Sequence, residues 1–289
     1  MQVSGSRPLD ETSGLYRLKH GHISENVVAR IAATHETLLD AARIRYDAYQ
    51  SRGYIDKNPE GLFADEIDAS PSCTTIVVYK NGAPAASART CLYDPSSNIP
   101  GSDWTPAMDV FRHEILALLN DEAGPERSHK ALEVMRLVRH PQFERDNEII
   151  FALLRAIGYL ILYRGVNIIY SGVRRNHIPI YRRLGFFQVT EPRAYPKLKF
   201  RTALIACIKT RVATEFPEID IFGDVSKSDS QYIDVISGKP TVISKIDFNV
   251  QNASSETPSR VSQTYILTSD TSKQTEMRTL PKATLIEAA

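Results

Sequence analysis

The sequence lacks the features that would place the protein in a membrane, outside the cell or on a nucleic acid. Lysine and arginine total 35, aspartate and glutamate total 34, and the net charge of +1 favours no nucleic-acid partner. The longest apolar run, residues 149–163, contains Arg155 and is too short to span a bilayer. Residues 1–14 are polar and contain no apolar segment typical of a secretion signal. We therefore expect a cytoplasmic protein without a transmembrane segment.

Cysteine is also scarce. Cys73, Cys91 and Cys207 lie far apart in the sequence, each in an apolar run typical of a strand. Their wide spacing does not match a metal site, so we expect no bound metal. An odd number of dispersed cysteines favours three reduced side chains in the core of a cytoplasmic protein. The remaining composition, 42% hydrophobic and 24% charged, is typical of an ordinary globular chain.

The composition divides the chain into three parts. Residues 1–24 form a polar tail, residues 25–216 contain most of the regular apolar pattern, and residues 217–289 are rich in Ser, Thr, Asp and Lys. The third part has three short apolar segments, at residues 232–236, 241–243 and 265–267. We expect it to be an appendage that is weakly ordered or adds edge strands to the main domain.

Turn and cap residues delimit the elements expected in the middle part. Thr34 and Gly53 bound a helix over residues 36–52. Asn81-Gly82 joins two β-rich runs and is a strong hairpin signal. The expected strands are 74–79, 85–92, 132–139, 167–173 and 200–209, and the other expected helices are 110–119, 148–164 and 178–184. Antiparallel strands followed by alternating helices and strands predict a mixed α/β sheet.

Charged and aromatic residues recur near the ends of these elements. The set comprises Arg45, Tyr49 and Tyr54 around the first helix, Asp65 and Asp68 before the hairpin, Arg89 on its second strand, and Glu133 and Arg136 on the next strand. Arginine suits bidentate recognition of carboxylate or phosphate. We interpret the aspartates as partners that orient the arginines around an acceptor pocket. The alternative is a purely structural ion-pair network.

Glu133 and Arg136 are three residues apart on one expected strand. Strict alternation would place their side chains on opposite faces of the sheet. Because bulges are frequent beside active sites, we predict a β-bulge between them that brings both into one cleft. Glu133 is then the candidate general base of this cleft. The alternative is an ion pair that closes one end of the sheet.

The stretch YSGVRRNHIPIYRRLGFFQV, residues 170–189, resembles the C-terminal half of the GNAT acyltransferase fold. The resemblance implies that Tyr181 protonates a departing thiolate, and that backbone amides near Leu137 and Val138 stabilise an oxyanion. Asn176 is closer to this tyrosine than the corresponding asparagine of the superfamily. The alternative is a helix that ends at Gly185 and is followed by a core phenylalanine.

The loop that holds coenzyme A in that superfamily departs from the expected pattern. Residues 139–147 contain no glycine that would let backbone amides surround a pyrophosphate, and Glu144 and Asp146 would repel it. An acyl carrier protein, whose phosphopantetheine arm carries a single phosphate, fits better as the donor. Five arginines near the later helices would attract this acidic partner or form a solvated face: Arg164, Arg174, Arg175, Arg182 and Arg183.

The ordered set of charged and aromatic residues is similar to two GNAT-like families, the acyl-homoserine lactone synthases and the long-chain N-acyl amino acid synthases. The Tyr-Arg-Arg-Leu-Gly-Phe segment at residues 181–186, and Tyr54 in place of a tryptophan, favour the second family. The resemblance implies a GNAT-like, mostly antiparallel sheet flanked by helices. It also implies transfer of a fatty acyl group from acyl carrier protein to an amino acid amine, without a tightly bound cofactor. The alternatives are a lactone synthase using S-adenosylmethionine and a non-catalytic binding protein.

Overall fold

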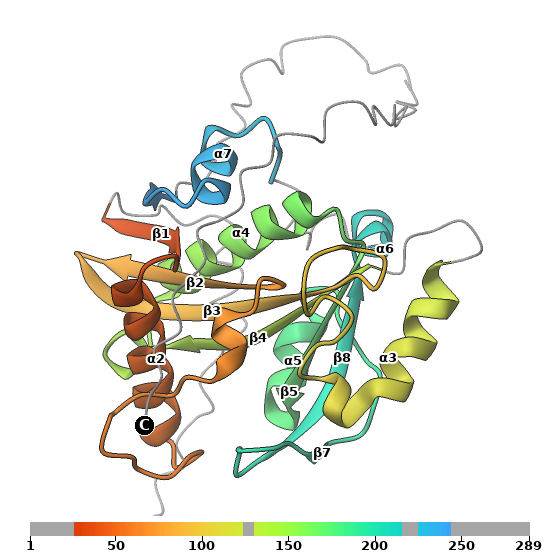
Figure 1. The fold of residues 1–289 in the computed structure, drawn as a ribbon, viewed down its shortest axis with the longest axis horizontal. Helices are drawn as coiled ribbons and strands as arrows, with labels where there is room; N and C mark the ends of the chain where they lie inside the picture. Colours follow the sequence, from red (N-terminus) through yellow and green to blue (C-terminus); the bar gives the residue numbers. More distant parts are fainter. Residues whose placement is uncertain (1–25, 124–129, 216–224, 244–289) are drawn as a thin grey trace, which may run out of the picture. The chain divides into compact units, whose positions relative to one another are not determined.

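The computed structural model describes residues 26–123, 130–215 and 225–243, which contain one mixed sheet flanked by helices (Figure 1). The sheet has nine strands in the order β6-β8-β5-β4-β3-β2-β1-β9, and β7 pairs with β8. Its strands are β1 (Val27–Ile31), β2 (Cys73–Lys80), β3 (Ala83–Tyr93), β4 (Ala131–Arg139), β5 (Ile168–Arg174), β6 (Phe187–Gln188), β7 (Arg193–Ala194), β8 (Arg201–Ile208) and β9 (Thr241–Val242). Among the described strands, β4 and β5 are the parallel pair. The expected mixed, mostly antiparallel sheet is confirmed.

The helices follow the expected order along the chain. They are α2 (His35–Gln50), α3 (Met108–Ala123), α4 (Asn147–Arg164), α5 (Ile178–Arg182), α6 (Lys209–Glu215) and α7 (Ser230–Ile236). Short 3₁₀ helices are η1 (Glu66–Ala69), η2 (Pro141–Phe143) and η3 (Arg175–His177). Within these described residues, no helix combines the length and the apolarity needed to cross a membrane.

Local signals explain where α2 and the hairpin begin and end. Thr34 caps α2, and its side chain accepts a hydrogen bond from the backbone of Thr37 while the Thr37 side chain accepts one from Thr34. Asn81 and Gly82 have φ angles of 52° and 77°, the left-handed conformation that a tight hairpin turn requires. Both predictions from the sequence are confirmed.

The two faces of the sheet are covered by different helices. Strand residues such as Ile76, Val78 and Val134 share a core with α4 and α5. On the opposite face, Val77 packs against α2 and Ala131 packs against α3. Because alternate residues of a strand face opposite sides, the odd-numbered residues of β3 from Ser87 onward and the Glu133 end of β4 lie on the α2–α3 face. This is the face that carries the candidate site.

A bulge and a strand separation interrupt the sheet at β4. Arg89 pairs with Met135 but Ser87 pairs with Val138, so β4 has one extra residue opposite Ala88. Arg136 adopts the left-handed conformation, with a φ of 53°. The predicted bulge is therefore confirmed, and Arg136 is its first residue. On the other side of β4, the pairing with β5 ends at Glu133 and Tyr170.

Residues 225–243, which belong to the expected appendage, are attached to the main sheet. Strand β9 pairs antiparallel with β1, and α7 lies over α4 (Figure 1). A buried set of residues, here called the anchor cluster, joins the two helices: Tyr159 donates to Asp229 at 2.9 Å, and Arg155 donates to both. The polar tail at residues 1–24 and the apolar segment at 265–267 lie outside the described residues.

Candidate functional site

Five charged residues meet on the α2–α3 face and are here called the site cluster: Arg45, Arg89, Arg136, Asp65 and Asp68. Helix η1 places both aspartates on one side, because Asp65 is its N-cap and Asp68 is its third residue. Arg45 donates to both carboxylate oxygens of Asp68 at 2.7 and 2.8 Å. Arg89 pairs with Asp65 and lies 3.2 Å from Asp68. The structure thus brings together residues from four separate segments.

Burial makes the charges of this cluster interact strongly. Arg45 and Arg89 are 1% and 0% exposed. Burial lowers the pKa of Arg45, and the charge of Asp68 only partly offsets this effect. Burial also acts to raise the pKa of Asp65, but its hydrogen bond with Arg89 and the nearby arginine charges hold that pKa below its ordinary value. For Arg89 the two aspartates outweigh burial and raise its pKa above the ordinary value.

Arg136 joins the cluster because of the bulge. Its left-handed backbone turns the side chain onto the Glu133 side of the sheet, where Nη2 lies 3.2 Å from Asp65. The guanidinium carbon is 4.3 Å from the centre of the Phe63 ring and 6.0 Å from that of Tyr49. Without the extra residue, alternation would direct Arg136 into the core beneath α4.

Glu133 lies beside the site cluster in a fully buried position. Its neighbour on β3 is Cys91, two pairs along from the Arg89–Met135 pair. The backbone amide of Ala107, at the start of α3, donates to its carboxylate at 2.9 Å, and Thr105 also contributes a hydrogen bond. Burial raises the pKa of Glu133 to about 7, although these hydrogen bonds and the arginines act to lower it. A carboxyl group with this pKa can accept a proton near neutral pH.

An aromatic wall extends from Arg136 to the end of β5. The rings of Tyr49 and Phe63 meet edge to face at 5.2 Å, and Tyr54 lies 6.4 Å from Tyr49. Tyr54 in turn contacts Phe200 at 4.9 Å, and the guanidinium of Arg174 lies 4.4 Å from the Tyr54 ring. The two tyrosines expected at the site are therefore placed between two arginines.

Tyr181 contributes from the other side of the sheet. It packs with the core beneath α4, and its ring meets Phe186 edge to face at 5.4 Å. Burial raises the pKa of Tyr181 to about 12, with a smaller contribution from Tyr49. The hydroxyl therefore holds its proton at neutral pH and can donate it. Leu137 packs on the α4 side and Val138 on the α2 side, just beyond the bulge.

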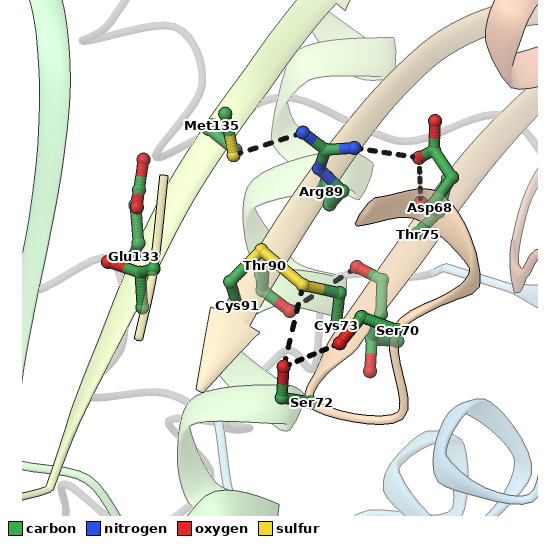
Figure 2. Close-up of a disulfide and its surroundings, with 12 residues drawn as sticks. Asp68, Ser70, Ser72, Cys73, Thr75, Arg89, Thr90, Cys91, Glu133 and Met135 are labelled. Carbon is green, nitrogen blue, oxygen red and sulfur yellow. Dashed lines mark hydrogen bonds and ion pairs between the residues drawn. A yellow bond between two sulfur atoms is a disulfide. The ribbon is translucent and has the colours of Figure 1, made fainter. Parts of the chain in front are cut away.

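The cysteines correct one expectation. Cys73 and Cys91 are directly opposite each other on β2 and β3 and form a disulfide (Figure 2). The prediction of three reduced cysteines is wrong for this pair, because its sequence spacing gave no sign that a hairpin register would place the two side by side. Cys207 is buried and free. The disulfide lies next to Glu133 across the sheet, because Cys91 pairs with Cys73 on β2 and with Glu133 on β4.

Several residues that support the site were not identified from the sequence. Phe63 stacks on Arg136, and Thr75 accepts from Arg45 at 3.2 Å and donates to Asp68. Thr105 and Ala107 hold Glu133. Phe63 could have been identified from the sequence, because it is an aromatic residue two positions before Asp65. The others depend on contacts between distant segments. Among the described residues, no group of histidine, cysteine or acidic side chains could hold a metal.

A mostly antiparallel sheet that opens between β4 and β5, with a bulged β4 carrying a buried carboxylate, defines a GNAT-like acyltransferase. The family model of the N-acyl amino acid synthase FeeM matches residues 40–207, more than half of the chain. The chain therefore belongs to the FeeM family of N-acyl amino acid synthases, and it is an acyltransferase.

The solved structure of FeeM agrees with this fold. FeeM, an N-acyl amino acid synthase from uncultured soil microbes, is 18% identical with a TM-score of 0.51, over 63% of this chain and 90% of FeeM. The acyl-homoserine lactone synthase LasI is 14% identical with a TM-score of 0.46, over 65% of this chain and 92% of LasI. No curated protein sequence matches this chain.

Proposed function

We propose that the protein transfers a long-chain fatty acyl group from acyl carrier protein to the α-amine of an amino acid, in the cytoplasm. The observation that carries this proposal is Glu133, a buried carboxyl group with a pKa of about 7 on the same side of the bulged strand as Arg136. An α-amine is largely protonated at neutral pH, so N-acylation needs a base at the reacting nitrogen.

The geometry supports a direct transfer. Glu133 accepts one proton of the ammonium group, and the nitrogen forms a bond to the thioester carbonyl carbon. The second proton of the nitrogen leaves to solvent as the tetrahedral intermediate forms. Backbone amides of β4 near Leu137 and Val138 stabilise the oxyanion, since β4 and β5 no longer pair beyond Glu133. The carbon–sulfur bond then breaks, and the thiolate takes a proton from Tyr181. The proton held by Glu133 returns to the tyrosine through solvent.

The loop between β4 and α4 supports acyl carrier protein over coenzyme A as the donor. A side-chain oxygen of Asp146 accepts from the Glu148 amide at 3.1 Å, so the protein's own carboxylate caps the helix end that would face a pyrophosphate. Lys80 forms ion pairs with the side chains of Asp146 and Glu148. The acidic residues at the start of α4 disfavour the pyrophosphate of coenzyme A there.

The arginines around η3 and α5 suit an acidic carrier protein. Arg175, Arg182 and Arg183 are exposed. They flank the Tyr181 segment, where the pantetheine arm would enter, and would accelerate association at low salt. For the acyl chain, Leu137, Phe151 and Leu154 offer half-buried apolar surface next to the bulge.

The test is mass spectrometry of the products formed from palmitoyl-acyl carrier protein, the common amino acids and S-adenosylmethionine. We expect one N-palmitoyl amino acid, absent when the Glu133→Gln variant replaces the wild type. A homoserine lactone product would instead identify a lactone synthase. A second arm replaces the donor with palmitoyl-coenzyme A. An equal rate with that donor would contradict the carrier-protein assignment, and an intact thioester in both arms would contradict the acyl transfer.

A further inference from the structure

The site cluster contains more positive than negative charge, and its arginines are paired to different extents. Three arginines face two aspartates, and Glu133 adds a charge that depends on pH. Both Nη groups of Arg45 are engaged by Asp68 and Thr75. Both Nη groups of Arg89 are engaged as well, by Asp65 and by the sulfur of Met135. These two arginines are therefore held by the protein itself, although the sequence indicated both as candidates to bind a carboxylate or a phosphate of the substrates.

Arg136 differs because one of its two Nη groups has no partner, whereas in Arg45 and Arg89 the nitrogen without a partner among the described residues is Nε. Its side chain is 9% exposed, and Nη2 is held by Asp65. Within the described residues, Nη1 is buried and makes no hydrogen bond. The Phe63 ring covers the guanidinium at 4.3 Å and fixes its plane. A buried cationic donor left without an acceptor is costly, and an anionic ligand would remove that cost.

The position of Nη1 of Arg136 relative to Glu133 indicates which anion it binds. Glu133 and Arg136 are three residues apart and project from the same face of β4. A base that removes a proton from the acceptor's amine lies at that nitrogen, and in an α-amino acid the carboxylate is one carbon further. The phosphate of a pantetheine arm, by contrast, is separated from the reacting thioester by the whole arm.

We propose that Nη1 of Arg136 binds the α-carboxylate of the acceptor, and that this contact makes the enzyme select amino acids over simple amines. The proposal rests on the proposed function. It assigns to Arg45, Arg89 and the two aspartates the role of holding Arg136 and its surroundings in place. Phe63 and Asp65 fix the guanidinium so that Nη1 remains available.

The first experiment needs no variant. The preferred amino acid is compared with its carboxamide and with the amine that lacks the carboxyl group, using the wild-type enzyme and acyl carrier protein donor. We expect kcat/KM to be about 10- to 100-fold lower for both analogues, mainly through KM. Equal kcat/KM for the acid and the carboxamide would overturn the proposal.

The second experiment combines these acceptors with Arg136→Met and Arg136→Lys. Loss of the carboxylate contact predicts that Arg136→Met no longer distinguishes the acid from the amide, while KM for the acyl donor stays the same. Arg136→Lys retains the positive charge but lacks the planar guanidinium with two Nη groups. It should therefore keep part of the selectivity that Arg136→Met loses. The matched control is Arg43→Gln, which changes an arginine of α2 that is 61% exposed and should leave every parameter unchanged.

The outcomes separate this proposal from the proposed function. An equal fall in kcat for all acceptors in Arg136→Met would assign Arg136 to the oxyanion, and a rise in donor KM would assign it to the phosphate; either overturns the carboxylate contact. Should the wild type acylate no amine, the proposed function fails. Calorimetric titration with the amino acids and their carboxamides then decides, since binding of an acid alone supports the subsite and equal or absent binding overturns it.

Discussion

The protein buries arginine in two places, and the two clusters differ in how completely their polar atoms are paired. In the anchor cluster, Arg155 donates to Tyr159 and Asp229, and Tyr159 donates to the same carboxylate at 2.9 Å. In the site cluster, buried nitrogens of three arginines remain without hydrogen-bond partners among the described residues. Arg45 and Arg89 of the site cluster are as buried as Arg155 of the anchor cluster, so burial of the arginines alone does not separate the two clusters.

The difference indicates separate roles. A satisfied buried network fixes one arrangement of the chain, here the attachment of α7 to α4. An incompletely satisfied network is costly to maintain, and it persists where a ligand completes it or where chemistry depends on it. The site cluster also adjoins Glu133, whose pKa is raised to about 7, and the bulge at Arg136. Among the described residues, the anchor cluster adjoins the ring of Tyr232 and the backbone amide of Ser226, which donates to Asp229.

The largest effect is expected from Glu133→Gln. Removal of the base should lower kcat by about 10²- to 10⁴-fold. The free energy of unfolding at pH 8 should stay the same or rise, because the wild type buries an ionised carboxylate there. Enzyme assays and thermal melts measure both quantities. The matched control is Glu114→Gln on the surface of α3, and a variant that keeps more than a tenth of the activity would remove Glu133 from the mechanism.

Arg155→Met tests the opposite cluster. It leaves Asp229 buried without its cation and should lower the free energy of unfolding by about 3–5 kcal/mol. The folded fraction should keep the wild-type kcat, since the anchor cluster lies away from the site. Urea titration and assays at low temperature provide the two values. A loss of kcat in fully folded Arg155→Met protein would contradict a purely structural role of the anchor cluster. Arg43→Gln again serves as the control.

The disulfide provides a smaller effect at the border of the site cluster. Cys73 and Cys91 are 18 residues apart, and replacing both with alanine should lower the free energy of unfolding by about 2–4 kcal/mol. Alkylation of unfolded wild-type protein should modify Cys207 alone before reduction and all three cysteines afterwards. Three modified cysteines without a reductant would contradict the disulfide.

The smallest expected change is the pH dependence of kcat/KM and of stability that arises from Glu133. Because Glu133 must be ionised to act, kcat/KM should rise about tenfold per pH unit below pH 7 and flatten above it, and Glu133→Gln should lack this rise. The folded pKa exceeds the ordinary value of 4.5, so this group's contribution to stability is full below pH 4.5. It is lost as the pH rises through about 7. A flat rate profile between pH 5.5 and 7.5 would contradict the assignment.

Much of the fold could be predicted from local signals. Thr34, the Asn81-Gly82 turn and the apolar period of α4 depend on residues a few positions away, so the sequence identified them. The buried side of α2 depends on tertiary packing. Ile44 and Ala48 are buried, whereas Tyr46 and Tyr49 are half-exposed at the aromatic side. The helix packs through small residues that leave room for the buried Arg45.

The sequence by itself determined the order of elements, the charged and aromatic residues of the site, and the need for a bulge between Glu133 and Arg136. Tertiary structure alone decided that Cys73 meets Cys91, that Ala107 holds Glu133, that Asp229 reaches Arg155, and that Arg136 keeps one free arm. The physical reason is that pairing, burial and pKa depend on strand register and on segments distant in the chain, which no local pattern encodes.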